Sequence, residues 1–148
     1  MTKYITLIIL ISTLAVYSQN PVKMITPKNA KENFAEFIAK KKFYPENTSP
    51  GISDEKLRPI LTKKINEVAN DFKKISELQN PTDKKYLEVI KSGLEKFPEI
   101  ELGYDSEDRE RICLYFQEIM DIVGLKSSSG MLNKFYYGFD IEKPIKKN

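Results

Sequence analysis

The segment 110–124, E-R-I-C-L-Y-F-Q-E-I-M-D-I-V-G, constrains the fold more than any other part of the chain. At helical spacing its apolar side chains cover roughly half of the helix circumference. These are Ile112, Cys113, Tyr115, Phe116, Ile119, Met120, Ile122 and Val123. Polar residues occupy the other half, with Leu114 as the exception. A surface helix needs a narrower apolar stripe, so the sequence predicts a helix that two or three neighbours contact at the centre of a small bundle.

Helical periodicity and capping signals extend this prediction to the rest of the chain. The sequence predicts an all-α fold, a small bundle of four main helices plus a short fifth C-terminal helix. The main helices are expected at 27–42, 53–78, 82–97 and 106–123, and the short one at 128–137. The first helix is expected to be capped by Thr26, the second by Ser53, the third within 80–83, and the fourth by Asp105 or Ser106. Pro59 is expected to cause a kink or a fresh start in the second helix. Gly93 is expected to permit a close contact between helices.

The C-terminal segment 131–139 is the one place where the type of element stays open. Its apolar residues fit a short helix that ends at Gly138. The run F-Y-Y at 135–137 is also good strand sequence. The helix fits the spacing better.

The N-terminus has the three parts of a secretory signal peptide. Lys3 gives a positive start, 4–16 is an apolar run, and Val16 and Ser18 suit cleavage before Gln19. An uncleaved N-terminal anchor is the alternative. The expected organisation is a signal peptide (1–18), an N-terminal tether (19–25), a single helical domain (26–139) and a basic C-terminal tail (140–148). The protein is therefore expected to be exported, periplasmic or extracellular, and not membrane-spanning after signal cleavage.

Composition excludes several classes of function. The chain has no histidine and one cysteine, so neither a zinc site of the usual N/S type nor a histidine-dependent catalytic triad can be assembled. It contains no glycine-rich motif that would cradle a nucleotide phosphate. A net charge of +3 without basic tracts does not favour binding to nucleic acid. No catalytic, cofactor-binding or metal-binding residue is assigned, and no cofactor is expected.

Acidic residues gather in the connection 99–110 and on the polar side of the predicted central helix. The connection could hold Ca²⁺, although its spacing lacks the pattern of an EF-hand and helix capping explains the same residues. Glu118 and Asp121 could act as a catalytic carboxylate pair, or they could form a solvated helix face. The basic triplet 40–42 could dock an acidic partner, although its position also suits the negative end of a helix.

Cys113 could be a reactive thiol, but it lies on the apolar arc and has no histidine to activate it, which favours a place in the core. Several other side chains could form a surface for a partner. Phe43 and Tyr44 begin the non-helical segment 43–53, where they could line a site or tie the loop to the bundle. Leu114 stands among polar residues, and Tyr136 and Tyr137 belong to an aromatic cluster that cannot all point inward. These five residues are the candidate partner surface, with core closure as the alternative for the C-terminal aromatics.

Three runs together resemble a family of small bacterial proteins described only as a domain of unknown function. They are P-E-N-T-S-P-G-I-S-D-E-K-L-R-P-I-L (45–61), E-D-R-E-R-I-C-L-Y-F-Q-E-I-M-D-I-V-G-L (107–125) and L-N-K-F-Y-Y-G-F-D (132–140). The resemblance would cover most of the mature chain and agrees with an exported helical domain, but it implies no activity, ligand or site residue. The expected function is a non-enzymatic binding or protein-interaction domain of the cell envelope, such as an inhibitor or immunity-type partner of another exported protein. A small carboxylate-dependent hydrolase is the alternative, and the oligomeric state is left open.

Overall fold

The computed structural model describes residues 20–46 and 49–138, and the predicted signal peptide and basic tail lie outside these ranges. Six helices occur in the described residues. They are α1 (Ala30–Ala39), α2 (Leu57–Ser76), α3 (Asp83–Leu94), α4 (Glu99–Leu102), α5 (Ser106–Val123) and α6 (Met131–Tyr137). Apart from two isolated bridges, the described residues form no β-structure, so the prediction of a small all-α bundle is confirmed.

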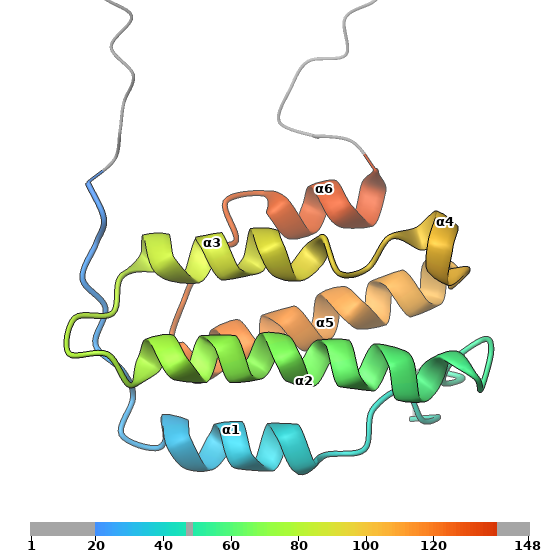
Figure 1. Cartoon of the computed structure of the whole chain (residues 1–148), viewed down its shortest axis with the longest axis horizontal. Coiled ribbons are helices and arrows are strands. Elements are labelled where there is room, and N and C mark those ends of the chain that lie inside the picture. The colour runs from blue at the N-terminus through green and yellow to red at the C-terminus, as the bar shows by residue number, and fades with distance from the viewer. Residues whose placement is uncertain (1–19, 47–48, 139–148) are drawn as a thin grey trace, which may run out of the picture.

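The helices lie nearly side by side, and the long ones alternate in direction along the chain (Figure 1). Helix α2 contacts α1, α3 and α5, while α5 contacts α1, α2 and α6. Two helices, rather than α5 alone, therefore form the centre of the bundle. The prediction that α5 touches several neighbours is confirmed.

The apolar arc of α5 lies in the core as its spacing predicts. Ile112, Tyr115, Phe116 and Ile119 are fully buried. They meet side chains from α1, α2 and α3 in one continuous core. At roughly 1.5–3 kcal/mol for each large apolar side chain removed from water, this arc is a main source of stability.

Gly93 marks the closest approach of α3 to its neighbours. A Cβ added there would lie 2.9 Å from Cγ2 of Val68 on α2 and 3.1 Å from the ring of Phe116 on α5. Only a residue without a side chain fits at this distance, which confirms the predicted role of Gly93.

Helix α1 is shorter at both ends than the predicted range 27–42. Thr26 is not its cap, since the residue before the helix is Asn29; the Thr26 hydroxyl donates to the carbonyl of Ser76 at the end of α2 (3.0 Å). The helix begins after Asn29, and the backbone leaves it at Lys40, where ψ is 133°. Before α1, the amide of Met24 donates to the carbonyl of Pro81 (2.9 Å), which holds this part of the chain against the connection between α2 and α3.

Helix α2 begins at Leu57, later than predicted, and Pro59 lies in its first turn. Proline is tolerated there because the first amides of a helix have no intrahelical acceptor. The expected new start at Pro59 thus coincides with the start of the helix. Ser53 is no cap; its hydroxyl donates to Asp108.

The caps of α3 and α5 agree with the sequence. Thr82 accepts from the amide of Lys85, and Asp105 accepts from the amides of Glu107 and Asp108. Helix α3 ends at Leu94, earlier than predicted, and Phe97 is buried after it. Helix α6 is the predicted C-terminal helix rather than a strand, and it ends at Gly138 with φ of 73°. The acidic connection contains α4, which periodicity did not predict because it is only one turn long.

Within the described ranges, no helix has the length and apolar character needed to cross a bilayer.

Candidate functional site

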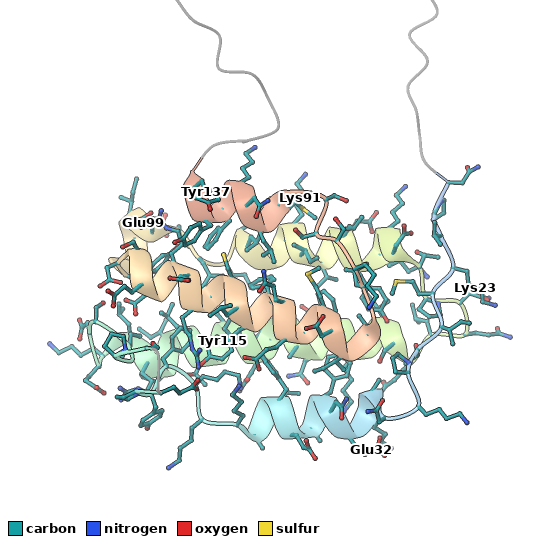
Figure 2. All side chains as sticks on the ribbon, turned by 180° about the vertical axis from the view of Figure 1, so that it is seen from behind. Lys23, Glu32, Lys91, Glu99, Tyr115 and Tyr137 are labelled. Atoms are coloured by element: carbon teal, nitrogen blue, oxygen red, sulfur yellow. The ribbon has the colours of Figure 1, made fainter. Side chains whose placement is uncertain are left out.

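One side of α5 remains uncovered by the rest of the bundle. Figure 2 shows α5 crossing the front of the molecule between α6 on one side and α1 on the other. The exposed residues of the helix interior follow a helical stripe of Glu107, Glu110, Leu114, Gln117 and Asp121. Leu114 is 39% exposed, so it lies on the surface and not in the core.

Helix α6 forms one wall beside this stripe. A hollow of about 260 Å³ between α5 and α6 is lined by Glu110, Leu114, Tyr136 and Tyr137, among others. Tyr137 is 51% exposed, and its ring meets that of Tyr136 edge to face at 4.7 Å between centroids. The structure thus brings together three of the predicted partner-surface residues, Leu114, Tyr136 and Tyr137.

A second hollow lies on the other side of Leu114. It measures about 270 Å³ and is lined by Ser49, Pro50, Glu107, Glu110, Arg111 and Leu114. Glu110 and Leu114 therefore form a ridge between two hollows. We call the stripe with these two hollows the α5–α6 surface.

Ion pairs fix the walls of this surface. Arg109 pairs with Glu99 of α4 and donates from Nη1 to the carbonyl of Tyr136 (3.2 Å), which ties α4, α5 and α6 together. Arg111 pairs with Glu46 and so holds the loop before α2 against α5. Both guanidinium groups are thereby occupied within the protein.

Phe43 does not belong to the candidate surface, because it is only 1% exposed. Its φ of 61° is in the left-handed region, which is rare for a bulky residue. Its amide donates to the hydroxyl of Tyr115 (2.8 Å), and its carbonyl accepts from the amide of Ile52 (3.2 Å) and from Nε of Arg58 (3.2 Å). Phe43 therefore ties the loop to the bundle, which was the alternative reading of its position.

Tyr44 is exposed but lies on a different part of the molecule. The guanidinium carbon of Arg58 stands 4.1 Å from the centre of its ring, and Nζ of Lys41 stands 5.7 Å from it. A hollow of about 440 Å³ here is lined by residues from the end of α1 and the start of α2. Tyr44 thus forms a separate patch and does not extend the α5–α6 surface.

The basic triplet mostly serves the protein itself. Nζ of Lys40 pairs with Glu118 on α5 (2.9 Å), and Lys42 is buried with its Nζ donating to the carbonyls of Phe37 and Lys40. Burial, reinforced by the charge of Lys40 and opposed by that of Glu118, lowers the pKa of Lys42 to about 8. Lys42 therefore complements the carbonyl end of α1, whereas Lys40 links α1 to α5 and Lys41 lies near the ring of Tyr44.

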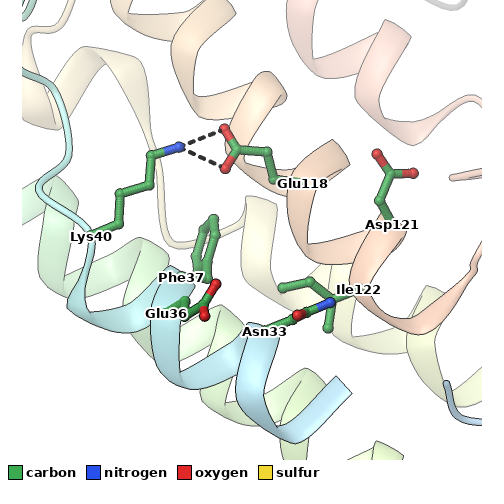
Figure 3. A pocket seen from close by; sticks show the side chains of 7 residues that line it. All are labelled: Asn33, Glu36, Phe37, Lys40, Glu118, Asp121 and Ile122. Carbon is green, nitrogen blue, oxygen red and sulfur yellow. Dashed lines mark hydrogen bonds and ion pairs between the residues drawn. The ribbon is translucent and has the colours of Figure 1, made fainter. Parts of the chain in front are cut away.

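The predicted carboxylate pair lies at the edge of a groove between α1 and α5. The groove measures about 550 Å³ and includes Glu36, Glu118 and Asp121 (Figure 3). Figure 3 shows Lys40 reaching Glu118, with Asp121 standing apart from that pair. Glu118 is therefore engaged by Lys40 (2.9 Å) and is not arranged as a pair with Asp121.

Cys113 lies below the α5–α6 surface. Its Sγ is 3.8 Å from the carbonyl of Leu132, and the side chain is almost completely buried. Burial raises the pKa of the thiol to about 12, against a smaller opposing effect of Arg109. A thiolate is therefore not available near neutral pH, which agrees with a place in the core.

Two residues of the acidic connection stabilise the start of α5. The Asp105 and Asp108 side chains form a reciprocal capping box at the start of α5, and buried Asp108 also accepts from the amide of Ser53 (3.3 Å). Among the residues that the structure describes, no group of His, Cys, Asp and Glu is arranged to hold a metal ion.

Sequence reasoning missed two members of the surface, Glu107 and Glu110. Both were assigned to the acidic connection because they precede the apolar part of α5. Extending the helical wheel backwards from Leu114 would have placed them on the same stripe. Ile100 was also missed; it is fully exposed on α4, and nothing in its local sequence distinguishes it from a core residue.

Comparisons with known proteins identify the family of this chain. Residues 25–140 match the model of a domain of unknown function, DUF4844. The chain is also similar to the crystal structure of a DUF3571 family protein from Acinetobacter baumannii AYE at 1.95 Å resolution, with 32% sequence identity and a TM-score of 0.67. That similarity covers 74% of this chain and 89% of the other. No curated protein matches. The chain therefore belongs to the family of the domain of unknown function DUF4844.

Proposed function

We propose that this protein is an exported, non-enzymatic binding domain that docks another exported protein on its α5–α6 surface. The observation that carries the proposal is the exposed Leu114 beside Tyr136 and Tyr137 on an otherwise polar helix face. Tyrosine is enriched among the side chains that dominate binding at protein interfaces, and Leu114 extends the exposed apolar area beside the two tyrosines. The walls of the surface are fixed by ion pairs, so little order has to be gained on binding.

A carboxylate-dependent hydrolase finds less support. Its best candidate, Glu118, forms an ion pair with Lys40, and both side chains are 39% exposed. A general acid in a sugar-cleaving site needs a carboxyl group whose protonated form is favoured by burial. The groove between α1 and α5 leaves Glu118 partly exposed to solvent and paired with Lys40.

The docking part of the proposal is tested by affinity capture from an envelope extract, followed by reconstitution with the purified partner. The Leu114→Glu substitution should weaken the reconstituted complex by at least about ten-fold, since it places a charge at the centre of the interface. Ile60→Glu, at an apolar position of α2 that is 45% exposed, is the matched control and should leave the affinity unchanged. Equal affinity of Leu114→Glu and the parent protein would refute docking at this surface.

Export is tested separately. Mass spectrometry of the envelope fraction should find a chain that begins at Gln19. The support for this expectation is the apolar run 4–16 behind Lys3 and the small residue at the cut. A mature chain that retains Met1 would refute the cleaved signal but would leave docking untouched.

A further inference from the structure

We infer that the segment recognised by the α5–α6 surface is cationic, with lysine or arginine side chains flanking one bulky apolar side chain. The inference rests on the proposed function, because it names the class of partner for the same surface. It combines the exposed apolar side chain of Leu114 with the acidic residues that precede and follow Leu114 on the stripe.

Two carboxylates that are unpaired within the described residues lie at one end of the stripe. Glu107 and Glu110 are exposed, and neither forms an ion pair with another residue in the described part of the chain. The neighbouring arginines do not neutralise them, because Arg109 pairs with Glu99 and Arg111 pairs with Glu46. The negative charge at this end is therefore available to a partner.

Capping does not account for these two carboxylates. The N-terminus of α5 is capped by the side chains of Asp105 and Asp108. Glu107 lies in the first turn, where the helix dipole favours an acid, but Glu110 lies beyond it, where the dipole effect falls off. The side chain of Glu110 instead borders both hollows of the surface.

The far end of the stripe is also acidic. Beyond Leu114 the exposed residues are Gln117 and Asp121, so an acidic group follows the apolar ridge as well as preceding it. Asp121 lines one adjoining hollow together with Lys126, and another together with Lys40, which pairs with Glu118. The stripe itself contains no basic residue.

The negative charge of the stripe is opposite in sign to the net charge of the whole chain. The chain has 24 Lys and Arg against 21 Asp and Glu, so an acidic stripe stands out on a protein of positive net charge. Complementary charge steers a partner and fixes its register, while a buried apolar anchor supplies most of the binding energy. A cationic segment with an apolar side chain seated beside Leu114 would satisfy both requirements.

Peptide probes test this chemistry directly. Three synthetic peptides of about 15 residues, a length that suits helix or strand docking, are titrated into the protein purified from cells expressing the full-length chain. One carries lysines on both sides of a single phenylalanine, one has glutamate at each lysine position, and one keeps the lysines but has serine in place of phenylalanine. The readout is the shift of backbone amide signals of residues 107–121 and 132–137 in a ¹⁵N-labelled sample.

The lysine–phenylalanine peptide should shift these signals and should bind more weakly as ionic strength rises. The other two peptides should bind at least about ten-fold more weakly, since each lacks one of the two elements. The double substitution Glu107→Lys/Glu110→Lys should weaken the first peptide by at least about ten-fold. Glu88→Lys/Glu95→Lys, at exposed positions in α3 and directly after it, makes the same change of charge elsewhere and should have little effect.

Three results would overturn the inference. They are stronger binding of the glutamate peptide, no binding of any peptide, and self-association of the chain that Leu114→Glu abolishes, which would assign the surface to a second copy. The captured partner separates this inference from the proposed function. A complex weakened by Leu114→Glu but not by Glu107→Lys/Glu110→Lys would keep docking at this surface and reject a cationic partner.

Discussion

The amide of Phe43 donates a 2.8 Å hydrogen bond to the hydroxyl of Tyr115, across 72 positions of sequence. Phe43 is buried with its backbone in the left-handed region, and Tyr115 is fully buried near the middle of α5. The same hydroxyl accepts from Nε of Arg111 (3.3 Å), whose guanidinium group pairs with Glu46. The hydroxyl oxygen of Tyr115 thus links Phe43, in the loop before α2, to Arg111, which lines the α5–α6 surface.

Tyr115→Phe should therefore destabilise the protein although it keeps the ring. It removes the acceptor of a buried backbone amide, and an unsatisfied buried donor costs about 1–3 kcal/mol. Denaturant melts should show this loss, and hydrogen exchange should show faster exchange of the Phe43 amide. Tyr136→Phe, for which the structure shows no hydroxyl hydrogen bond among the described residues, is the control and should stay within about 0.5 kcal/mol. Equal stability of both variants would contradict the anchoring role.

The close approach at Gly93 gives a second prediction. Alanine is a better helix former than glycine by about 1 kcal/mol, so Gly93→Ala would stabilise an isolated helix. In the bundle, the new Cβ would meet Val68 at 2.9 Å and the ring of Phe116 at 3.1 Å. Overpacking of this kind costs about 1–3 kcal/mol, which outweighs the gain in helix propensity.

The expected result is a lower midpoint of thermal unfolding for Gly93→Ala than for the parent protein. Ser92→Ala, at the adjacent exposed position of the same helix, supplies the control and should be neutral or slightly stabilising. A Gly93→Ala protein that melts above the parent would show that α3 can move away from α2 and α5 without cost.

Cys113 gives a third prediction. Burial raises the pKa of its thiol to about 12, so the thiolate that reacts with labelling reagents is nearly absent from the native state at about pH 8. A thiol reagent should therefore label the protein quickly in denaturant and very slowly under native conditions. Cys113→Ala should cost about 1–2 kcal/mol through the small cavity that it leaves. Fast native labelling would place the thiol in the floor of the α5–α6 surface as a reactive group.

The distance along the chain between interacting residues decides which parts of the fold could be predicted from the sequence. The buried arc of α5, its cap and the stop of α6 at Gly138 depend on residues close together in the chain. The arc and the stop were predicted, and the cap was narrowed to Asp105 or Ser106, of which Asp105 is the cap. The start of α1 was not predicted correctly, because the Thr26 hydroxyl bonds to the carbonyl of Ser76 fifty positions away. Local signals cannot show that a capping residue has found a distant acceptor.

The candidate site follows the same division. Leu114 could be predicted as an exposed apolar residue, since its place on the helical wheel of α5 is a local property. The burial of Phe43 could not, because it depends on a hydroxyl group supplied by Tyr115 from another helix. Nor could the sequence show that Arg109 and Arg111 are occupied by ion pairs, which leaves the acids between them available.

The last prediction concerns Lys42, which is 1% exposed and has a pKa lowered to about 8 by burial. Its Nζ donates to the carbonyls of Phe37 and Lys40 and lies 4.4 Å from the centre of the Phe37 ring. The charged groups that act on it are Lys40, which lowers its pKa, and Glu118, which raises it.

Between the folded pKa of about 8 and the unfolded value of 10.5, the unfolded state holds a proton that the folded state has released. The contribution of Lys42 to the free energy of unfolding must therefore rise with pH in this window. From about pH 7 to about pH 9.5 the rise should be about 2 kcal/mol.

The measurement is the difference in free energy of unfolding between the parent protein and Lys42→Met at both pH values. Taking the difference cancels the opposite trend of Cys113, Tyr86 and Tyr104, whose pKa values are raised by burial. Lys41→Met, at the adjacent exposed position, is the control and should give a difference that does not change with pH. If the parent and Lys42→Met differ by the same amount at both pH values, the ammonium group keeps its proton on folding. The carbonyls of Phe37 and Lys40 would then offset the whole cost of burying a charge at the end of α1.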